Sequence, residues 1–128
     1  MSKNRILFVD DDPDFRQEFC PLLEAAGYAV TQADSEKQAE ELMAKDAFDL
    51  AVVDLRMERP DSGFTLAYHI KKQTPDFPII LVSAVNGEIG LNFSLNSKAE
   101  RAWIKADAFL NKPLRFEQLK YEVERLIK

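Results

Sequence analysis

The 128-residue sequence has little of three features that would each indicate a particular class of protein. It contains one cysteine, Cys20, so an internal disulfide framework and a cysteine-based zinc site are excluded. Four glycines and six prolines are too few for a low-complexity chain. No apolar run approaches the ~18 residues of a membrane helix, and the run at 6–9 stops at three aspartates, unlike a signal peptide. We therefore expect a cytoplasmic protein that does not enter a membrane.

The net charge argues against one class of function, and the chain length limits the number of domains. The net charge of −5 disfavours direct binding to nucleic acid. A chain of this length, with 46% hydrophobic residues, is long enough to bury one core. We predict one domain over residues 1–128.

Short apolar runs alternate with helical patterns along the chain. The apolar runs predict strands at 6–9, 28–31, 49–54, 78–83 and 108–110. The helical patterns cover about 13–26, 35–45, 64–74, 98–105 and 116–126. Five strands alternating with five helices predict an α/β fold, a doubly wound parallel sheet in a three-layer αβα arrangement.

Polar residues stand where these strands end. They are Asp10, Asp11, Asp54, Ser83 and Lys112. In a parallel sheet, sites form outside the carboxyl ends of the strands. Carboxylates gathered there repel one another unless a hard cation such as Mg²⁺ lies between them. A hydroxyl and an ammonium beside them can contact phosphoryl oxygens, so the pattern indicates phosphoryl transfer.

With these residues in place, the sequence resembles the receiver domain of two-component response regulators, the CheY-like family. The matching segments are ILFVDDDP at 6–13, DLAVVDLRM at 49–57, DSG at 61–63, IILVSA at 79–84 and AFLNKP at 108–113. The resemblance implies a flavodoxin-like fold with strand order 2-1-3-4-5. It also implies a phosphoacceptor signalling domain rather than an enzyme, although such a domain assists its own phosphorylation and autodephosphorylation.

The resemblance also assigns the metal and phosphorylation residues. Asp54 matches the phosphoacceptor, which receives its phosphoryl group from a sensor histidine kinase or a phosphotransfer protein. Asp10 and Asp11 match the acidic pair, with Asp11 a direct ligand of Mg²⁺. Asp54 and the backbone carbonyl of Arg56 would complete the protein ligands.

Further residues match the switch. Ser83 corresponds to the switch hydroxyl, Lys112 to the phosphate-binding lysine and Phe109 to the aromatic residue that rotates on activation. The peptide bond before Pro113 is cis in most relatives. The switch would control a downstream protein partner or an output domain that the sequence does not contain.

Two side chains border the path of the attacking water in relatives, and here they are Arg56 and Val85. Neither offers a carboxylate or an amide that could orient the water. We therefore expect slow autodephosphorylation.

The sequence departs from its relatives most clearly at 86–96. There Ile89, Leu91, Phe93 and Leu95 alternate with polar residues or glycine, a pattern with the period of a strand and not of a helix. We expect an extended or irregular segment, with the next helix beginning at the Ser97 cap. Its apolar edge would pack on a neighbouring helix, on a partner or on a second copy of the chain in a homodimer.

Other functions fit parts of the pattern. A haloacid-dehalogenase-type phosphohydrolase would use Asp10 as its nucleophile, and a receiver-like adaptor would never be phosphorylated. A calcium loop on Asp10, Asp12 and Asp14 is rejected, since glycine and acid are missing from its sixth and twelfth positions. The single histidine, His69, has no second ligand near it in sequence, and we expect it to be a solvated side chain.

Overall fold

The computed structural model describes residues 3–55, 62–84 and 106–127. Five parallel strands form one sheet in the order β2-β1-β3-β4-β5. The strands are β1 (Arg5–Val9), β2 (Ala29–Ala33), β3 (Leu50–Asp54), β4 (Ile79–Ala84) and β5 (Ala108–Lys112). The helices within the described ranges are α1 (Pro13–Ala25), α2 (Glu36–Lys45), α3 (Ser62–Gln73) and α5 (Phe116–Leu126).

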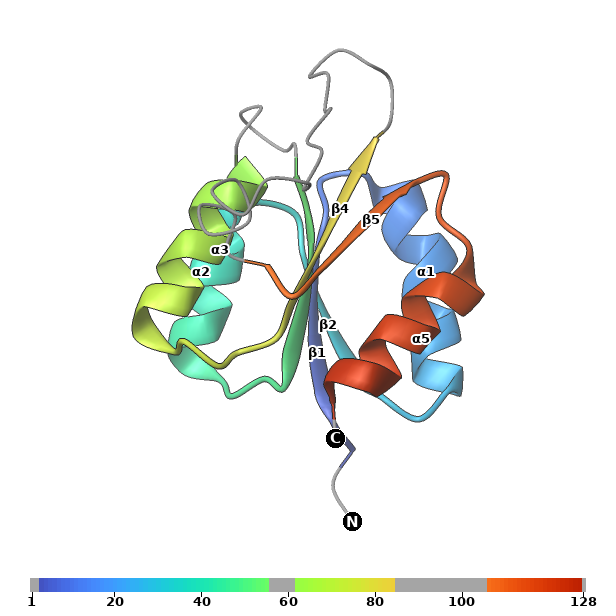
Figure 1. The fold of residues 1–128 in the computed structure, drawn as a ribbon, viewed down its shortest axis with the longest axis horizontal. Helices are drawn as coiled ribbons and strands as arrows, with labels where there is room; N and C mark the ends of the chain where they lie inside the picture. Colours follow the sequence, from blue (N-terminus) through green and yellow to red (C-terminus); the bar gives the residue numbers. More distant parts are fainter. Residues whose placement is uncertain (1–2, 56–61, 85–105, 128) are drawn as a thin grey trace.

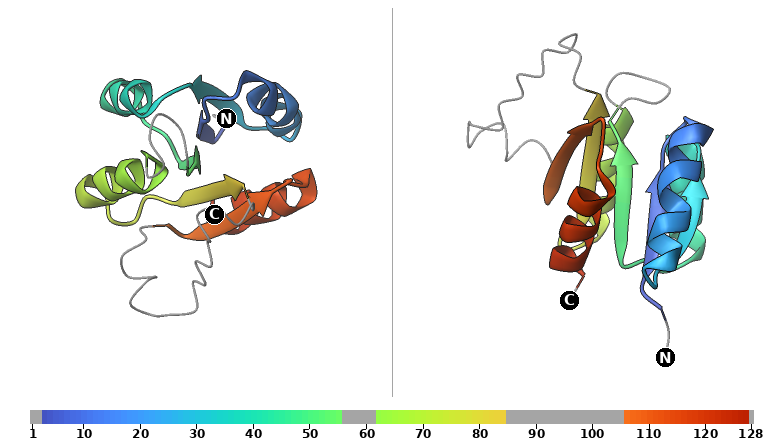
Figure 2. Two further views of the ribbon diagram at one scale, coloured as in Figure 1. Left: turned by 90° about the horizontal axis from the view of Figure 1, so that it is seen from above. Right: turned by 90° about the vertical axis from the view of Figure 1, so that its right-hand side faces the viewer.

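The helices cover both faces of the sheet. Figure 1 and Figure 2 show α2 and α3 on one face and α1 and α5 on the other. The buried side chains divide accordingly, with Leu7 and Val9 of β1 in the core beneath α2 and α3, and Ile6 and Phe8 in the core beneath α1 and α5. This alternation explains why β1 is apolar at every position from Ile6 to Val9. The architecture and the strand order confirm the predicted doubly wound fold.

Side-chain caps fix where two helices begin. The Asp12 carboxylate accepts a hydrogen bond from the Asp14 N–H at 3.0 Å, at the start of α1. Ser35 Oγ accepts from the Gln38 N–H at 3.1 Å, and the Gln38 side chain accepts from the Asp34 N–H at 2.7 Å. These bonds satisfy backbone donors that have no partner within the helix, and they place the start of α2 where the capping pattern predicts it.

Of the elements that the structure describes, three differ from their predicted bounds by two residues at one end, and the other predicted ends differ by one residue at most. β2 covers 29–33 rather than 28–31, because its five residues pair with all five of β1. β5 continues to Lys112 because Asn111 and Lys112 pair with the end of β4. The helix expected from 64 begins at Ser62.

Several predictions lie outside the described residues. They concern Arg56 and Val85, the alternating segment 86–96 and the helix at 98–105, and they stay predictions. Among the described residues, none of the helices is both long and apolar enough to cross a membrane.

Candidate functional site

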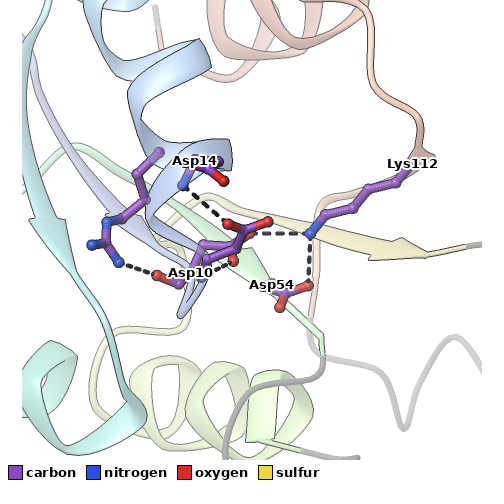
Figure 3. Close-up of polar contacts among 6 residues, drawn as sticks. Asp10, Asp14, Asp54 and Lys112 are labelled. Atoms are coloured by element: carbon purple, nitrogen blue, oxygen red, sulfur yellow. Dashed lines mark hydrogen bonds and ion pairs between the residues drawn. The ribbon is translucent and has the colours of Figure 1, made fainter.

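The carboxyl ends of the strands bring Asp10, Asp54 and Lys112 together (Figure 3). Asp10 directly follows β1, Asp54 ends β3 and Lys112 ends β5. The ammonium of Lys112 lies 3.2 Å from Asp10 Oδ2 and 3.6 Å from Asp54 Oδ1. Two aspartates and one lysine that are far apart in sequence therefore lie together. They meet at the edge of the sheet where the sequence predicts a site.

Asp10 is the most deeply buried acid of this group, with 1% of its surface exposed. Its Oδ1 accepts a hydrogen bond from the Asp12 N–H at 2.9 Å, and its backbone carbonyl accepts one from Arg16 at 2.6 Å. Burial raises the pKa of the Asp10 carboxyl, although the Asp12 N–H and the Lys112 ammonium act against the rise. The positive charge of Lys112 thus compensates only part of the cost of burying this carboxylate.

Lys112 is held from a third side by an aromatic ring. Its Nζ lies 4.2 Å from the ring centroid of Phe15, a half-buried residue in the first turns of α1. An ammonium over an aromatic face is attracted by the ring's quadrupole. Phe15 lies in the segment 13–26 that the sequence predicts to be helical, and the pattern there contains no sign of this contact with Lys112.

Asp10, Asp11 and Asp54 together form an acidic cluster. One carboxylate oxygen from each lies within 4.8 Å of the others. Asp10 and Asp54 are buried whereas Asp11 is exposed, so the cluster opens to solvent on one side. An all-oxygen donor set that is partly open to water suits Mg²⁺, which retains several waters when bound. The residues present therefore fit the metal that the family resemblance implies.

The remaining predicted site residues are placed as follows. Ser83 is buried near the end of β4, with 3% of its surface exposed, and Phe109 packs partly buried against the core beneath α2 and α3. The Lys112–Pro113 peptide bond is cis. Arg56 and Val85 lie outside the described residues.

A close backbone contact supports Asp54 from α3. The Gly63 N–H donates to the Leu55 carbonyl at 2.8 Å, and a Cβ on Gly63 would stand 2.5 Å from the Asp54 carbonyl oxygen. Only a residue without a side chain fits there. The glycine of the DSG segment therefore allows α3 to begin against the backbone that carries Asp54.

Comparison with known proteins also finds response regulators. Response regulator protein PilR from Pseudomonas aeruginosa is 31% identical over 121 residues, which cover 94% of this chain and 25% of PilR. The chain thus spans about a quarter of the length of this curated relative.

Solved structures match the fold closely. A CheY-like receiver domain protein from Methanospirillum hungatei is 28% identical with a TM-score of 0.80, covering 98% of this chain and 94% of that one. The response regulator TrrA from Thermotoga maritima, solved in complex with Mg²⁺ and BeF, is 28% identical with a TM-score of 0.77. That match covers 96% of this chain and 98% of TrrA.

The family model of the response regulator receiver domain matches residues 6–124, nearly the whole chain. Together with the strand order and the acidic strand ends, this match establishes that the chain belongs to the receiver domain family of two-component response regulators.

Proposed function

We propose that this receiver domain accepts a phosphoryl group on Asp54 from a sensor histidine kinase or a phosphotransfer protein. The observation that carries the proposal is the surroundings of Asp54. Its side chain is 8% exposed, lies 3.6 Å from the Lys112 ammonium and shares an acidic cluster with Asp10 and Asp11. A carboxylate nucleophile, an ammonium that can contact phosphate and a set of metal ligands therefore lie together at one edge of the sheet.

The chemistry follows from these groups. A carboxylate oxygen of Asp54 forms the new bond to phosphorus, while the bond from phosphorus to the donor's imidazole nitrogen breaks and its electron pair leaves with the ring. The Lys112 ammonium and the Ser83 hydroxyl would contact the phosphoryl oxygens. Because phosphoryl transfer depends mainly on positioning and electrostatics, such contacts supply much of what the reaction needs.

The same proposal assigns a metal. Asp10, Asp11, Asp54 and the backbone carbonyl of Arg56 would hold Mg²⁺, which when bound neutralises charge on the phosphoryl oxygens. The complex of TrrA with Mg²⁺ and BeF supports this assignment by similarity. Deletion of one carboxylate, in Asp11→Ala, should strongly weaken Mg²⁺ binding measured by calorimetry.

Phosphorylation would then change the partner that the domain contacts. We propose a cytoplasmic signalling role in which a downstream protein, an output domain or a second copy of the chain reads the phosphorylated state. The domain would be a phosphoacceptor and not a metabolic enzyme.

The test is to locate the phosphoryl group. The protein is incubated with acetyl phosphate and Mg²⁺, and intact mass should increase by one phosphoryl group in the wild type but not in Asp54→Asn. Borohydride reduction followed by peptide mass mapping then identifies the modified aspartate. Labelling of Asp10 would instead favour the phosphohydrolase, and no labelling of the wild type by any phosphodonor would favour the adaptor.

A further inference from the structure

A second group of metal-ligating side chains lies away from the sheet edge, between α2 and α3. It consists of Glu36 and Glu40 of α2 and His69 of α3. One ligand atom from each residue lies within 4.8 Å of the other two. His69 Nδ1 is 2.9 Å from Glu40 Oε2. The His69 side chain is 51% exposed, as the sequence predicts, and Glu40, which is distant in sequence, lies beside it.

The fold explains why these residues meet. Glu36 and Glu40 are four positions apart, so they project from the same side of α2 in successive turns. Figure 1 shows α2 and α3 side by side on one face of the sheet, and contacts between the two helices confirm that they are neighbours. His69 is thereby carried to the two glutamates although it is 29 positions from Glu40 in sequence.

We propose that Glu36, Glu40 and His69 form a binding site for a divalent transition-metal ion of the Zn²⁺ type. One imidazole nitrogen with two carboxylates is a donor set that Zn²⁺ accepts, usually with water in a further position. The cluster of Asp10, Asp11 and Asp54 contains oxygen donors alone, which is the preference of Mg²⁺. The chain would thus hold two cation sites that differ in the metal they select.

The geometry allows an ion to enter. The Glu40 and His69 side chains are 44% and 51% exposed, so small rotations can bring the donors around an ion without unpacking the core. Glu40 and His69 also line a cavity of about 360 Å³, together with Met43, Ile70 and Gln73. A water or a small ligand in that cavity could fill the remaining coordination positions.

The contact between His69 and Glu40 indicates which imidazole nitrogen carries the proton before an ion binds. An ionised carboxylate only accepts hydrogen bonds, so Nδ1 carries the proton that lies between the two side chains. An ion bound at Nδ1 takes the place of this proton, and the neutral imidazole then carries its proton on Nε2. The alternative is an ordinary exposed pair of His69 and Glu40, which contributes little to stability and binds no metal.

The experiment uses the fact that His69 is the single histidine of the sequence. Its imidazole proton signals in an NMR spectrum therefore need no assignment, provided that the chain carries no histidine tag. Zn²⁺ is titrated in the presence of saturating Mg²⁺. We expect the imidazole signals to shift and to saturate at one equivalent, whereas Mg²⁺ alone leaves them in place.

Variants separate a three-residue site from a lone histidine. Glu36→Gln and Glu40→Gln should each weaken the Zn²⁺ affinity roughly tenfold or more, since each removes a ligand. Glu41→Gln removes the same charge from an exposed position on the same helix and should leave the affinity unchanged. Amide spectra confirm that each variant is folded.

Two results would overturn the proposal. One is equal Zn²⁺ affinity in the wild type, Glu36→Gln and Glu40→Gln, which would mean that His69 binds the ion alone. The other is loss of the His69 response in Asp11→Ala, which would place the ion at the sheet edge. Neither result bears on whether Asp54 is phosphorylated, so this proposal and the proposed function can fail separately.

Discussion

Gly63 leaves no room for a side chain beside Asp54: a Cβ at position 63 would stand 2.5 Å from the Asp54 carbonyl oxygen and 2.6 Å from the Leu55 Cα. Both of these are backbone atoms, which cannot rotate away. In Gly63→Ala, α3 and the end of β3 must therefore separate. We expect a loss of about 1–3 kcal/mol in the free energy of unfolding, as for other overpacked sites, and slower phosphorylation. Urea unfolding and acetyl phosphate labelling measure the two effects.

Gly27→Ala is the matched control. Gly27 has a φ of 106°, which is unfavourable for alanine, but no atoms lie within 4 Å of the position its Cβ would take. This variant should lose about 1 kcal/mol of stability and retain the wild-type labelling rate. Equal labelling by Gly63→Ala and Gly27→Ala would contradict the role assigned to Gly63.

Asp10 contributes to the site at the expense of stability. Its carboxylate is buried, and burial raises its pKa. Without divalent metal, Asp10→Asn should therefore increase the free energy of unfolding by about 1 kcal/mol, since the amide oxygen can still accept from the Asp12 N–H. Asp14→Asn removes a charge from an exposed position on α1 and should bring no such gain. Adding Mg²⁺ should stabilise the wild type more than Asp10→Asn, a difference that urea unfolding can measure.

Phe15 should orient Lys112. Phe15→Leu keeps an apolar side chain but removes the ring that lies 4.2 Å from the ammonium. A cation–π contact contributes about 0.5–1 kcal/mol at a partly exposed site, so we expect phosphorylation to slow by about two- to fivefold. Phe15→Tyr keeps the ring and should label at the wild-type rate. The same rate in both variants would show that the ring has no influence on Lys112.

Cys20 should be inert in the folded protein. It is 1% exposed within the core beneath α1 and α5, and burial raises the pKa of its thiol to about 12. A thiol reagent at neutral pH should react with it only after unfolding. Reaction of the native protein at the rate of the unfolded chain would contradict this burial.

The thiol also makes stability depend on pH. Its pKa is raised in the folded state, so its contribution is intact below the ordinary value of 9.0 and is lost as the pH rises toward about 12. Between neutral pH and about pH 10, the wild type should lose about 1 kcal/mol more than Cys20→Ala. Urea unfolding at both pH values gives this difference, and the cavity made by the alanine cancels from it.

The central strands could be predicted because each contains an uninterrupted apolar run, at 6–9, 50–53 and 79–82. Burial on both faces requires this, and β3 is buried at all five positions. The end of β2 could not be located in the same way, because this edge strand contains Thr31 and Gln32, which are compatible with a loop. Its length depends on pairing with β1, a long-range property that a local pattern does not contain.

The candidate site, too, contains residues that could be grouped from the sequence and residues that could not. Asp10, Asp54 and Lys112 could be grouped from sequence because parallel strands end at one edge. Phe15 and Arg16 reach the site from α1, and their contacts depend on how that helix lies on the sheet. The approach of His69 to Glu40 likewise depends on the packing of α2 against α3. Side chains that helices bring to a site cannot be read from spacing alone.

The ion pair of Asp10 and Lys112 joins residues that are 102 positions apart. Within this sheet, Asp10 follows the first strand in chain order and Lys112 ends the last, so the acids remain without their lysine until β5 has joined the sheet beside β4. A nascent or truncated chain that lacks β5 therefore gathers negative charge at an edge with no ammonium to offset it. Because β5 carries Lys112, the site reaches its full charge balance only when this strand is paired with β4.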